Sequence, residues 1–518
     1  MARPTRYLIL PAQGLQASAG TASAAATSTL VNLAHTTGVA SMRTRLQGVV
    51  KAAAKTGAKL KAAAFNVVAS LNEDGVKLVE SSPEMIAALR FAQPGLRAVP
   101  EVFYRPAVAT VRLRHRVTKP AAAAPAAAKK LVVTVVNAAT GAPVAGVTVV
   151  GFTNFADSTG TSGVTSGTGK VTLTVTGSSS YERVYAQHDH PGLWSFLKKT
   201  VPTSGALAIS LEPLDLAAGD SLRHFHTVGA DLSVGAGVKV GVIDSGVDGS
   251  HPDLSVAGGL GCVPGSPENQ FGPSGSHGTH VAGIIAGRGG LPTGMRGIAP
   301  GAGIFSYRVF DDTANSGSSF GLVKAIRQGI ADGCDLLNMS LSFNHDENTG
   351  LPLVDDAVKD AITEAHAAGV VVIAAAGNDG RKPVSYPALD DLAIAVSAVG
   401  RKGTFPTKSS ESGDVAAPFG TDPKNFLAAF SNVGTALDVA GAGVAVVSTV
   451  PGGHAPMSGT SMACPAVTGV LARLLASTPA VLNLTRDANR ADAIKALLFA
   501  HAQSLGLGVT NEGKGLPQ

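Results

Sequence analysis

The sequence predicts an α/β protein in which a domain built on a parallel β-sheet follows a small α+β domain and a β-sandwich. From about residue 215 onward, short β-branched runs alternate with helical stretches. This alternation is typical of parallel strands joined by crossover helices. The 518 residues are 45% hydrophobic and 15% charged, with 62 glycines, which suits strands that are buried on both faces. The length is sufficient for two to four domains.

Residues 1–118 are expected to form the small α+β domain. Its pattern is strand, helix, strand, strand, helix, strand, with Ser82 as the cap of the second helix and Pro83 at its first position. An unrelated small α/β domain is the alternative. The expected elements are a strand at 6–11, a helix-leaning stretch at 27–55, two strands around an Asn-Glu-Asp-Gly turn at 65–80, a helix at 82–92 and a strand at 96–104.

An Ala- and Pro-rich linker is expected at 119–130, followed by a β-sandwich at 131–214. Four β-rich segments with Gly, Ser and Thr loops indicate the sandwich. They lie at 131–137, 144–152, 170–176 and 206–212. Nothing in this domain is typical of catalysis, so it is expected to hold position or to bind a partner. Trp194 and Tyr185 are expected either to form a surface patch that contacts a partner or to lie half-buried in the core.

Residues 215–518 form the expected catalytic domain. Strands are predicted at 238–243, 303–310, 334–341, 369–375 and 391–399, and helices at 277–287 and 319–332. Polar residues fall at strand ends and helix starts, which is where open α/β sheets form their clefts.

Three of these polar residues suggest a nucleophilic site. Asp244 ends the strand Val-Gly-Val-Ile-Asp, His277 opens a helix within Ser-His-Gly-Thr-His, and Ser461 lies in Ser-Gly-Thr-Ser before another helix. A serine hydroxyl needs a base to take its proton, and a histidine titrates near neutrality. An aspartate would hold the other imidazole nitrogen. Taken singly, the three are a strand-end cap, a core or metal-binding histidine and a helix cap, but together they indicate catalysis.

These motifs, in the order Asp, His, Ser, resemble those of the subtilisin-like serine proteases, also called subtilases or peptidase family S8. The resemblance implies a subtilisin-like catalytic domain and a serine endopeptidase that hydrolyses peptide bonds through an acyl-enzyme. The domain at 1–118 resembles the inhibitory propeptide of such zymogens. The enzyme would act on a polypeptide substrate, and its own N-terminal domain would be an intramolecular inhibitor.

A fourth motif, Ala-Ala-Ala-Gly-Asn at 374–378, ends a buried β-branched run. The family places its oxyanion-stabilising asparagine at the position of Asn378, and the backbone N–H of Ser461 would be the second donor. Acyl transfer puts negative charge on the carbonyl oxygen, and fixed donors stabilise that charge. Without the other motifs, Asn378 would be a plain turn residue.

The resemblance also implies residues that bind the substrate backbone. They are Ser340, Leu341 and Ser342 on one side, Gly317 on the opposing strand, and Gly377 beside the oxyanion asparagine. The substrate would add a strand between these segments. Family members often have two glycines after the Ser-Leu pair, whereas Ser342 and Phe343 follow here. Phe343 is expected to narrow the pocket that binds the substrate residue before the cleaved bond. The residue type that this pocket prefers therefore stays open.

Asp253 matches a calcium ligand of well-known family members. A calcium ion takes six to eight oxygen ligands, but the loop at 287–296 lacks the expected asparagine and carries two arginines. We therefore expect no required cofactor, with Asp253 left as the calcium candidate.

The remaining composition limits partners and location. A net charge of +5 without a dense basic stripe argues against a nucleic-acid partner, and no apolar run reaches the length of a membrane span. Three cysteines predict no disulfide framework. The start of the chain has no clear signal peptide, so a cytoplasmic or non-classically exported enzyme is expected and the compartment is left unknown.

Two further functions stay open. One is a dedicated processing or self-processing peptidase whose sandwich targets it to a partner, and the other is a pseudo-protease. Self-cleavage is expected between about Tyr104 and Lys130, which would leave the sandwich on the mature enzyme. The alternative cut, near 213–235, would discard both N-terminal domains. The natural substrate, the role of the sandwich and the oligomeric state are not predicted.

Overall fold

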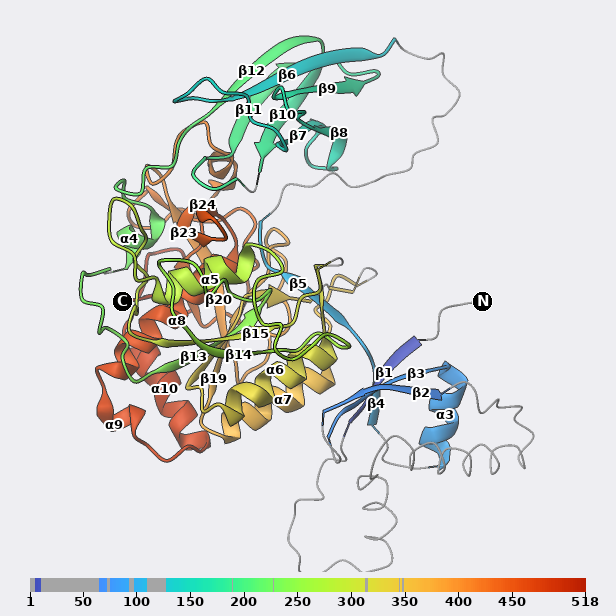
Figure 1. Cartoon of the computed structure of the whole chain (residues 1–518), viewed down its shortest axis with the longest axis vertical. Coiled ribbons are helices and arrows are strands. Elements are labelled where there is room, and N and C mark those ends of the chain that lie inside the picture. Colours follow the sequence, from blue (N-terminus) through green and yellow to red (C-terminus); the bar gives the residue numbers. More distant parts are fainter. Residues whose placement is uncertain are drawn as a thin grey trace, which may run out of the picture.

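The computed structural model describes residues 5–10, 65–71, 75–92, 97–109 and 127–518, the last range apart from 189, 227, 313–314, 344 and 347–348. Three bodies of secondary structure follow one another along the chain (Figure 1). The helix-leaning stretch at 27–55 and most of the predicted linker lie outside the described residues. No helix in the described ranges combines the length and the apolar character that crossing a bilayer requires.

The first body is an antiparallel sheet with strand order β2-β3-β1-β4 and one helix. Its elements are β1 (Thr5–Leu10), β2 (Phe65–Ser70), β3 (Lys77–Ser81), α3 (Pro83–Ala92) and β4 (Arg97–Pro100). Alternate residues of β1 face opposite ways, because successive side chains of a strand point to opposite faces. Tyr7 packs in one cluster with Met85 of α3. Leu8 belongs to the cluster that contains Phe320 and Ala357 of the third body.

The second body consists of two sheets, with strand orders β11-β10-β7-β8 and β12-β6-β9. The strands are β6 (Lys129–Asn137), β7 (Thr148–Asn154), β8 (Thr159–Val164), β9 (Lys170–Val175), β10 (Ser180–Gln187), β11 (Phe196–Pro202) and β12 (Gly205–Leu211). Side chains from both sheets form one buried cluster between them. Three of these strands, β8, β10 and β11, were not among the predicted β-rich segments.

The third body is built on an eight-stranded sheet with strand order β14-β15-β13-β17-β19-β20-β21, in which β22 also pairs with β20. All pairs are parallel except β20 with β21. Its strands are β13 (Lys239–Asp244), β14 (Val256–Gly261), β15 (Gly303–Arg308), β17 (Leu336–Met339), β19 (Val371–Ala375), β20 (Ile394–Arg401), β21 (Asn425–Leu427) and β22 (Val439–Ala442). The main helices are α5 (His277–Ala286), α6 (Ser319–Ala331), α7 (Asp356–Ala367), α8 (Thr460–Ala476) and α10 (Ala488–Ala500). The fold is therefore α/β, as predicted, with a largely parallel central sheet.

Smaller elements complete this body. They are α4 (Ser221–Phe225), β16 (Gly317–Ser318), β18 (Leu341–Ser342), the hairpin β23 (Val446–Val450) with β24 (Gly453–Met457), α9 (Pro479–Leu482), β25 (Ala502–Gln503), α11 (Val509–Glu512) and β26 (Leu516–Pro517).

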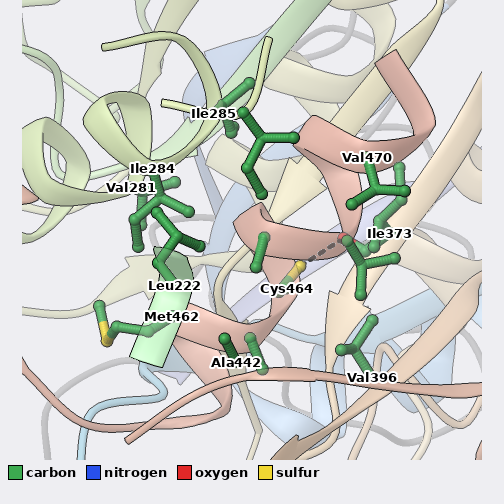
Figure 2. Packing of buried hydrophobic residues seen from close by; sticks show 14 of the residues in the cluster. Leu222, Val281, Ile284, Ile285, Ile373, Val396, Ala442, Met462, Cys464 and Val470 are labelled. Atoms are coloured by element: carbon green, nitrogen blue, oxygen red, sulfur yellow. Dashed lines mark hydrogen bonds between the residues drawn. The ribbon is translucent and has the colours of Figure 1, made fainter. Parts of the chain in front are cut away.

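Helix α8 runs through the core of the third body, between α5 and strands β19, β20 and β22. Figure 2 shows Val281 and Ile284 of α5 on one side of α8 and Ile373 and Val396 of the sheet on the other. The Cys464 thiol donates a hydrogen bond to the carbonyl oxygen of Ile373 at 3.3 Å. Packing on both sides fixes the position of the first turn of α8, where Ser461 lies.

The second body lies against the third. The Leu197 N–H donates to the carbonyl oxygen of Lys408 at 2.8 Å, and the Gly192 N–H donates to that of His454 at 2.8 Å. Trp194 is 8% exposed and shares a buried cluster with residues of the third body. Trp194 is therefore buried in a core that the two bodies share, and Tyr185, at 2% exposure, is buried in a separate cluster, so neither forms an exposed contact patch.

The predicted strand at 96–104 is two strands in the structure, β4 and β5 (Phe103–Pro106). β4 pairs with β1, whereas β5 pairs with β16 and β18 of the third body. The division falls after Pro100, which has no N–H for the sheet, and the chain then crosses to the other body (Figure 1). The boundary is set by tertiary pairing, which the sequence pattern does not encode.

Candidate active site

Asp244 and His277 meet because β13 ends where α5 begins. The Nδ1 atom of His277 lies 2.7 Å from Oδ1 and 2.9 Å from Oδ2 of Asp244. The Ser245 N–H also donates to Asp244 Oδ1, at 2.6 Å. With the carboxylate as acceptor, Nδ1 carries the proton and Nε2 is left as the basic nitrogen. Nε2 is buried and has no hydrogen-bond partner among the described residues.

Ser461 is the second residue of α8 and is fully buried. Its hydroxyl donates to the carbonyl oxygen of Ser340 at 2.8 Å, so this proton does not point to His277. In this state the Asp–His pair is formed, and proton transfer from serine to histidine requires the hydroxyl to leave Ser340.

A segment of the same chain lies beside Ser461 as an added strand. β5 pairs antiparallel with β16 through Phe103 and Tyr104, and with β18 through Arg105 and Pro106. Beyond β5, the Ala107 N–H donates to the Ser340 carbonyl oxygen at 3.2 Å, and the Ala109 N–H donates to that of Ser458 at 2.9 Å. Residues 103–109 are therefore held by main-chain bonds, the mode in which a sheet edge binds an extended peptide. Gly317, Ser340, Leu341 and Ser342 all contribute to this pairing.

The carbonyl oxygen of Ala107 accepts a hydrogen bond from the N–H of Ser461 at 3.1 Å. Gly459 permits this approach, since a Cβ there would come within 2.4 Å of that oxygen and its φ is +158°. The peptide bond from Ala107 to Val108 is thus the bond that faces Ser461. The sequence analysis did not single out Gly459, although the Ser-Gly-Thr-Ser motif contains it.

Asn378 follows β19 and is tied to the start of α8. Its Oδ1 accepts from the Thr460 N–H at 3.0 Å and from the Thr460 hydroxyl at 2.9 Å. Its Nδ2 is buried and has no partner in the described part of the chain. A fixed amide donor near Ser461 with no partner in the described residues fits a site where negative charge develops.

Gly377 does not make the predicted contact with the segment that lies where a substrate would bind. Its N–H donates to the Thr460 hydroxyl at 3.2 Å, and no hydrogen bond to residues 103–109 occurs. Its φ is +105°, and a Cβ would lie 2.4 Å from Asn432 Nδ2. Gly377 therefore shapes the turn that carries Asn378.

Tyr104 fills a closed pocket that the sequence analysis missed. Its side chain is fully buried, its ring centroid lies 5.5 Å from that of Phe343, and its hydroxyl donates to Asp355 Oδ2 at 2.9 Å. Burial raises the pKa of Asp355 to about 6 and raises the pKa of Tyr104 well above its usual value. Phe343 was expected to narrow the pocket of the residue before the cleaved bond. Its ring packs against that of Tyr104 instead.

Asp253 is engaged by protein groups. Its Oδ2 accepts from the Met295 N–H at 2.7 Å and pairs with His454 Nε2 at 2.7 Å. Gly289 and Gly294 pack so tightly on the carboxylate that a Cβ at either would collide with it. Across the described residues, no group of three or more His, Cys, Asp or Glu side chains is arranged to hold a metal ion. This donor set does not fit the many-oxygen shell of calcium.

The comparisons with known proteins agree with this arrangement. A sequence model of the subtilase family matches residues 235–516. Subtilisin NAT of Bacillus subtilis subsp. natto is 39% identical over 254 residues, which is 48% of this chain and 58% of that protein. Subtilisin of Bacillus pumilus is 39% identical over 254 residues, covering 80% of its length, and Subtilisin Savinase of Lederbergia lenta is 36% identical over 255 residues, also covering 80%. The match thus covers little more than half the length of the first of these relatives, and none of the three alignments extends over more than 48% of this chain.

Proposed function

Because this chain belongs to the subtilase family, we propose that it is a serine endopeptidase that hydrolyses peptide bonds through an acyl-enzyme. Ser461 is the nucleophile, His277 the general base and Asp244 the residue that orients the histidine. The observation that carries the proposal is the hydrogen bond from the Ser461 N–H to the Ala107 carbonyl oxygen. It presents a peptide bond of the chain itself to the serine.

In the first step, Ser461 Oγ attacks the carbonyl carbon while His277 Nε2 takes the hydroxyl proton. Collapse of the tetrahedral intermediate breaks the C–N bond, and His277 returns the proton to the leaving amine. Water then attacks the acyl-enzyme, with the same nitrogen as base, and releases Ser461. Asp244 keeps its hydrogen bond to Nδ1 throughout and stabilises the imidazolium.

Two donors are proposed to stabilise the oxyanion of both tetrahedral intermediates. The Ser461 N–H already bonds the carbonyl oxygen of the seated segment. The second donor is Asn378 Nδ2, which has its acceptor side fixed by Thr460 and its donor side unpaired in the described residues. Fixed donors cost no reorganisation when the charge forms.

The N-terminal body is proposed to be an intramolecular inhibitor that the enzyme removes by its own cut. Residues 103–109 occupy the strand edges beside Ser461, so another polypeptide cannot pair there at the same time. The sheet before them packs on the third body, where Leu8 and Phe320 share a cluster and Arg97 pairs with Asp360 of α7. We assign the self-cleavage to the bond between Ala107 and Val108, within the expected range of Tyr104 to Lys130.

Labelling with a fluorophosphonate tests the proposed function. The activated wild type is expected to label at one serine, while Ser461→Ala neither labels nor hydrolyses peptides. Ser477→Ala, at an exposed serine that caps the other end of the same helix, is the control and is expected to label normally. Labelling of folded Ser461→Ala, or an unlabelled wild type that still hydrolyses peptides, would contradict the proposal.

The closed pocket around Tyr104 favours the second candidate, a dedicated processing peptidase with few targets. A pocket that buries a whole side chain discriminates among substrates more than main-chain pairing does. Profiling with a peptide library separates the two. Cleavage confined to peptides with one residue type at the position of Tyr104 supports dedicated processing, and broad cleavage supports a general endopeptidase.

A further inference from the structure

We infer that Asp355 is a specificity-determining residue that selects tyrosine over phenylalanine at the fourth residue before the cleaved bond. The inference rests on the proposed function, in which the cut falls between Ala107 and Val108. Tyr104 is then the fourth residue on the amino side of that bond. Its hydroxyl donates to Asp355 Oδ2 at 2.9 Å, and both side chains are buried.

The carboxylate of Asp355 is held so that one oxygen remains for the substrate. Asp355 caps α7, and its Oδ1 accepts from the N–H groups of Ala357 at 3.0 Å and Val358 at 3.3 Å. These bonds fix the side chain and leave Oδ2 directed at the phenol. The N-terminus of a helix also favours negative charge on this carboxylate.

The rest of the pocket does not distinguish tyrosine from phenylalanine. Phe343 packs on the Tyr104 ring at 5.5 Å between centroids, and Val358 and Tyr386 belong to the same buried cluster. Contacts of this kind bind either ring. Only the hydroxyl separates the two residues, and Asp355 is its hydrogen-bond partner.

A phenylalanine in this pocket would leave Asp355 Oδ2 buried without a partner. Leaving a buried charged acceptor unpaired costs more than an ordinary hydrogen bond contributes, and a site built to bond a hydroxyl rejects the analogue that lacks it. We expect discrimination of about ten- to a hundredfold in kcat/KM.

The test compares two internally quenched peptides that span the sequence of residues 102–109 and differ only in tyrosine or phenylalanine at the position of Tyr104. Wild-type enzyme, expressed as the full chain and self-activated, is expected to cleave the tyrosine peptide about ten- to a hundredfold better. In Asp355→Ser, serine still caps the helix but is too short to reach the phenol. The preference is therefore expected to disappear, because the tyrosine peptide loses its acceptor and the phenylalanine peptide no longer leaves a buried carboxylate unpaired.

Asp487→Ser is the matched control, because Asp487 caps α10 and its side chain accepts from the Arg490 N–H in the first turn of that helix. It is expected to keep the wild-type preference. Asp355→Asn, which keeps the size and the cap, is a second variant in case Asp355→Ser does not fold, and it is expected to lower the preference.

Equal cleavage of both peptides by wild type, or an undiminished preference in a folded Asp355 variant, would overturn the inference and leave the endopeptidase proposal standing. Cleavage of neither peptide by wild type that is free of its N-terminal body would overturn both.

Discussion

The two donor groups of Ser461, its N–H and its hydroxyl, are bonded to different partners. Its N–H is bonded to the carbonyl oxygen of Ala107, as a substrate carbonyl would be, while its hydroxyl is bonded to Ser340 and is not yet engaged with His277. The proposed nucleophile and base therefore act only after one side-chain rearrangement. In the proposed mechanism they then act together.

The first prediction tests whether Ser461 and His277 act together. Ser461→Ala and His277→Ala are each expected to abolish peptide hydrolysis almost completely, and the double variant is expected to lose little more, as is known for the corresponding residues of a subtilisin. Steady-state kinetics on the three variants measures this. Additive losses would indicate that the two side chains act independently.

The second prediction concerns Asn378. In a subtilisin, loss of the amide donor lowers kcat roughly 10²–10³-fold, and we expect the same order for Asn378→Ala with KM little changed. Asn378→Asp is the matched variant, since it keeps an acceptor for Thr460 and removes the amide donor. A loss of kcat in the alanine variant alone would mean that Asn378 serves to hold Thr460.

At the scale of elements, helix α5 begins with His277 and contains the fully buried His280 one turn later. The Nε2 atom of His280 lies 3.1 Å from the Val446 carbonyl oxygen and 3.0 Å from that of Ala455, so it donates to β23 and β24. Burial lowers the pKa of His280 to about 3. The helix is thus tied to the hairpin by a neutral imidazole.

The third prediction concerns acid. Below its ordinary pKa of 6.5, His280 takes up a proton in the unfolded chain but not in the folded one. Its contribution to stability is therefore complete above pH 6.5 and is lost as the pH falls from 6.5 toward 3, by about 2 kcal/mol at pH 5. His280→Gln keeps a donor that cannot become charged.

Thermal melting between pH 7 and pH 5 tests this. The Tm of wild type is expected to fall more than the Tm of His280→Gln. His501→Gln, at an exposed histidine, is the control and should follow wild type. Parallel curves for wild type and His280→Gln would contradict the assignment.

Helices and strands could be predicted from the sequence where the local pattern of apolar residues determines them. The central strands, such as β13 and β19, are continuous apolar runs because both their faces are buried. β8 (Thr159–Val164) was missed because Thr-Gly-Thr-Ser-Gly-Val has little apolar character and its burial pattern alternates only between exposed and half-buried. β5 was joined to β4 because its partners lie more than 200 residues away along the chain.

The same distinction between local sequence signals and long-range pairing applies to the residues of the site. Asp244, His277, Ser461 and Asn378 lie in local motifs that carry their chemistry, although their roles stay predictions. The pairing of Tyr104 with Asp355 depends on a strand crossing from one body to another. Asp355 carries the local signal of a helix cap, and no local pattern marks it as the partner of a phenol.

At the scale of the whole molecule, the order of the three bodies decides which part of the chain the proposed self-cleavage would remove. The cut proposed after Ala107 lies before the sandwich, and the sandwich is bonded to the third body through Leu197 and Gly192. The fourth prediction is that the mature enzyme begins at Val108 and retains the sandwich.

Intact-mass analysis of wild type beside Ser461→Ala checks this outcome. Wild type is expected to yield two fragments that join at Ala107 and Val108, and Ser461→Ala is expected to stay uncut. A cut near residues 213–235 would place the sandwich in the discarded part. A cut that persists in Ser461→Ala would point to another protease.

The fifth prediction concerns metal removal. The carboxylate of Asp253 is already bonded to the Met295 N–H and to His454, so EDTA is expected to leave the Tm unchanged. Differential scanning fluorimetry with EDTA, and then with added calcium, measures this. A Tm that falls with EDTA and returns with calcium would show that a calcium site exists.

The junction between sandwich and third body has a spectroscopic consequence. Trp194 is the one tryptophan among 518 residues, and it is 8% exposed in the buried cluster that joins the two bodies. The intrinsic tryptophan emission of the whole chain therefore originates at this junction. Undocking of the sandwich would transfer the indole to water and shift the emission to longer wavelengths, whereas departure of the N-terminal body would leave it unchanged. The emission of Trp194 therefore distinguishes loss of the N-terminal body from loss of the sandwich in a single time course.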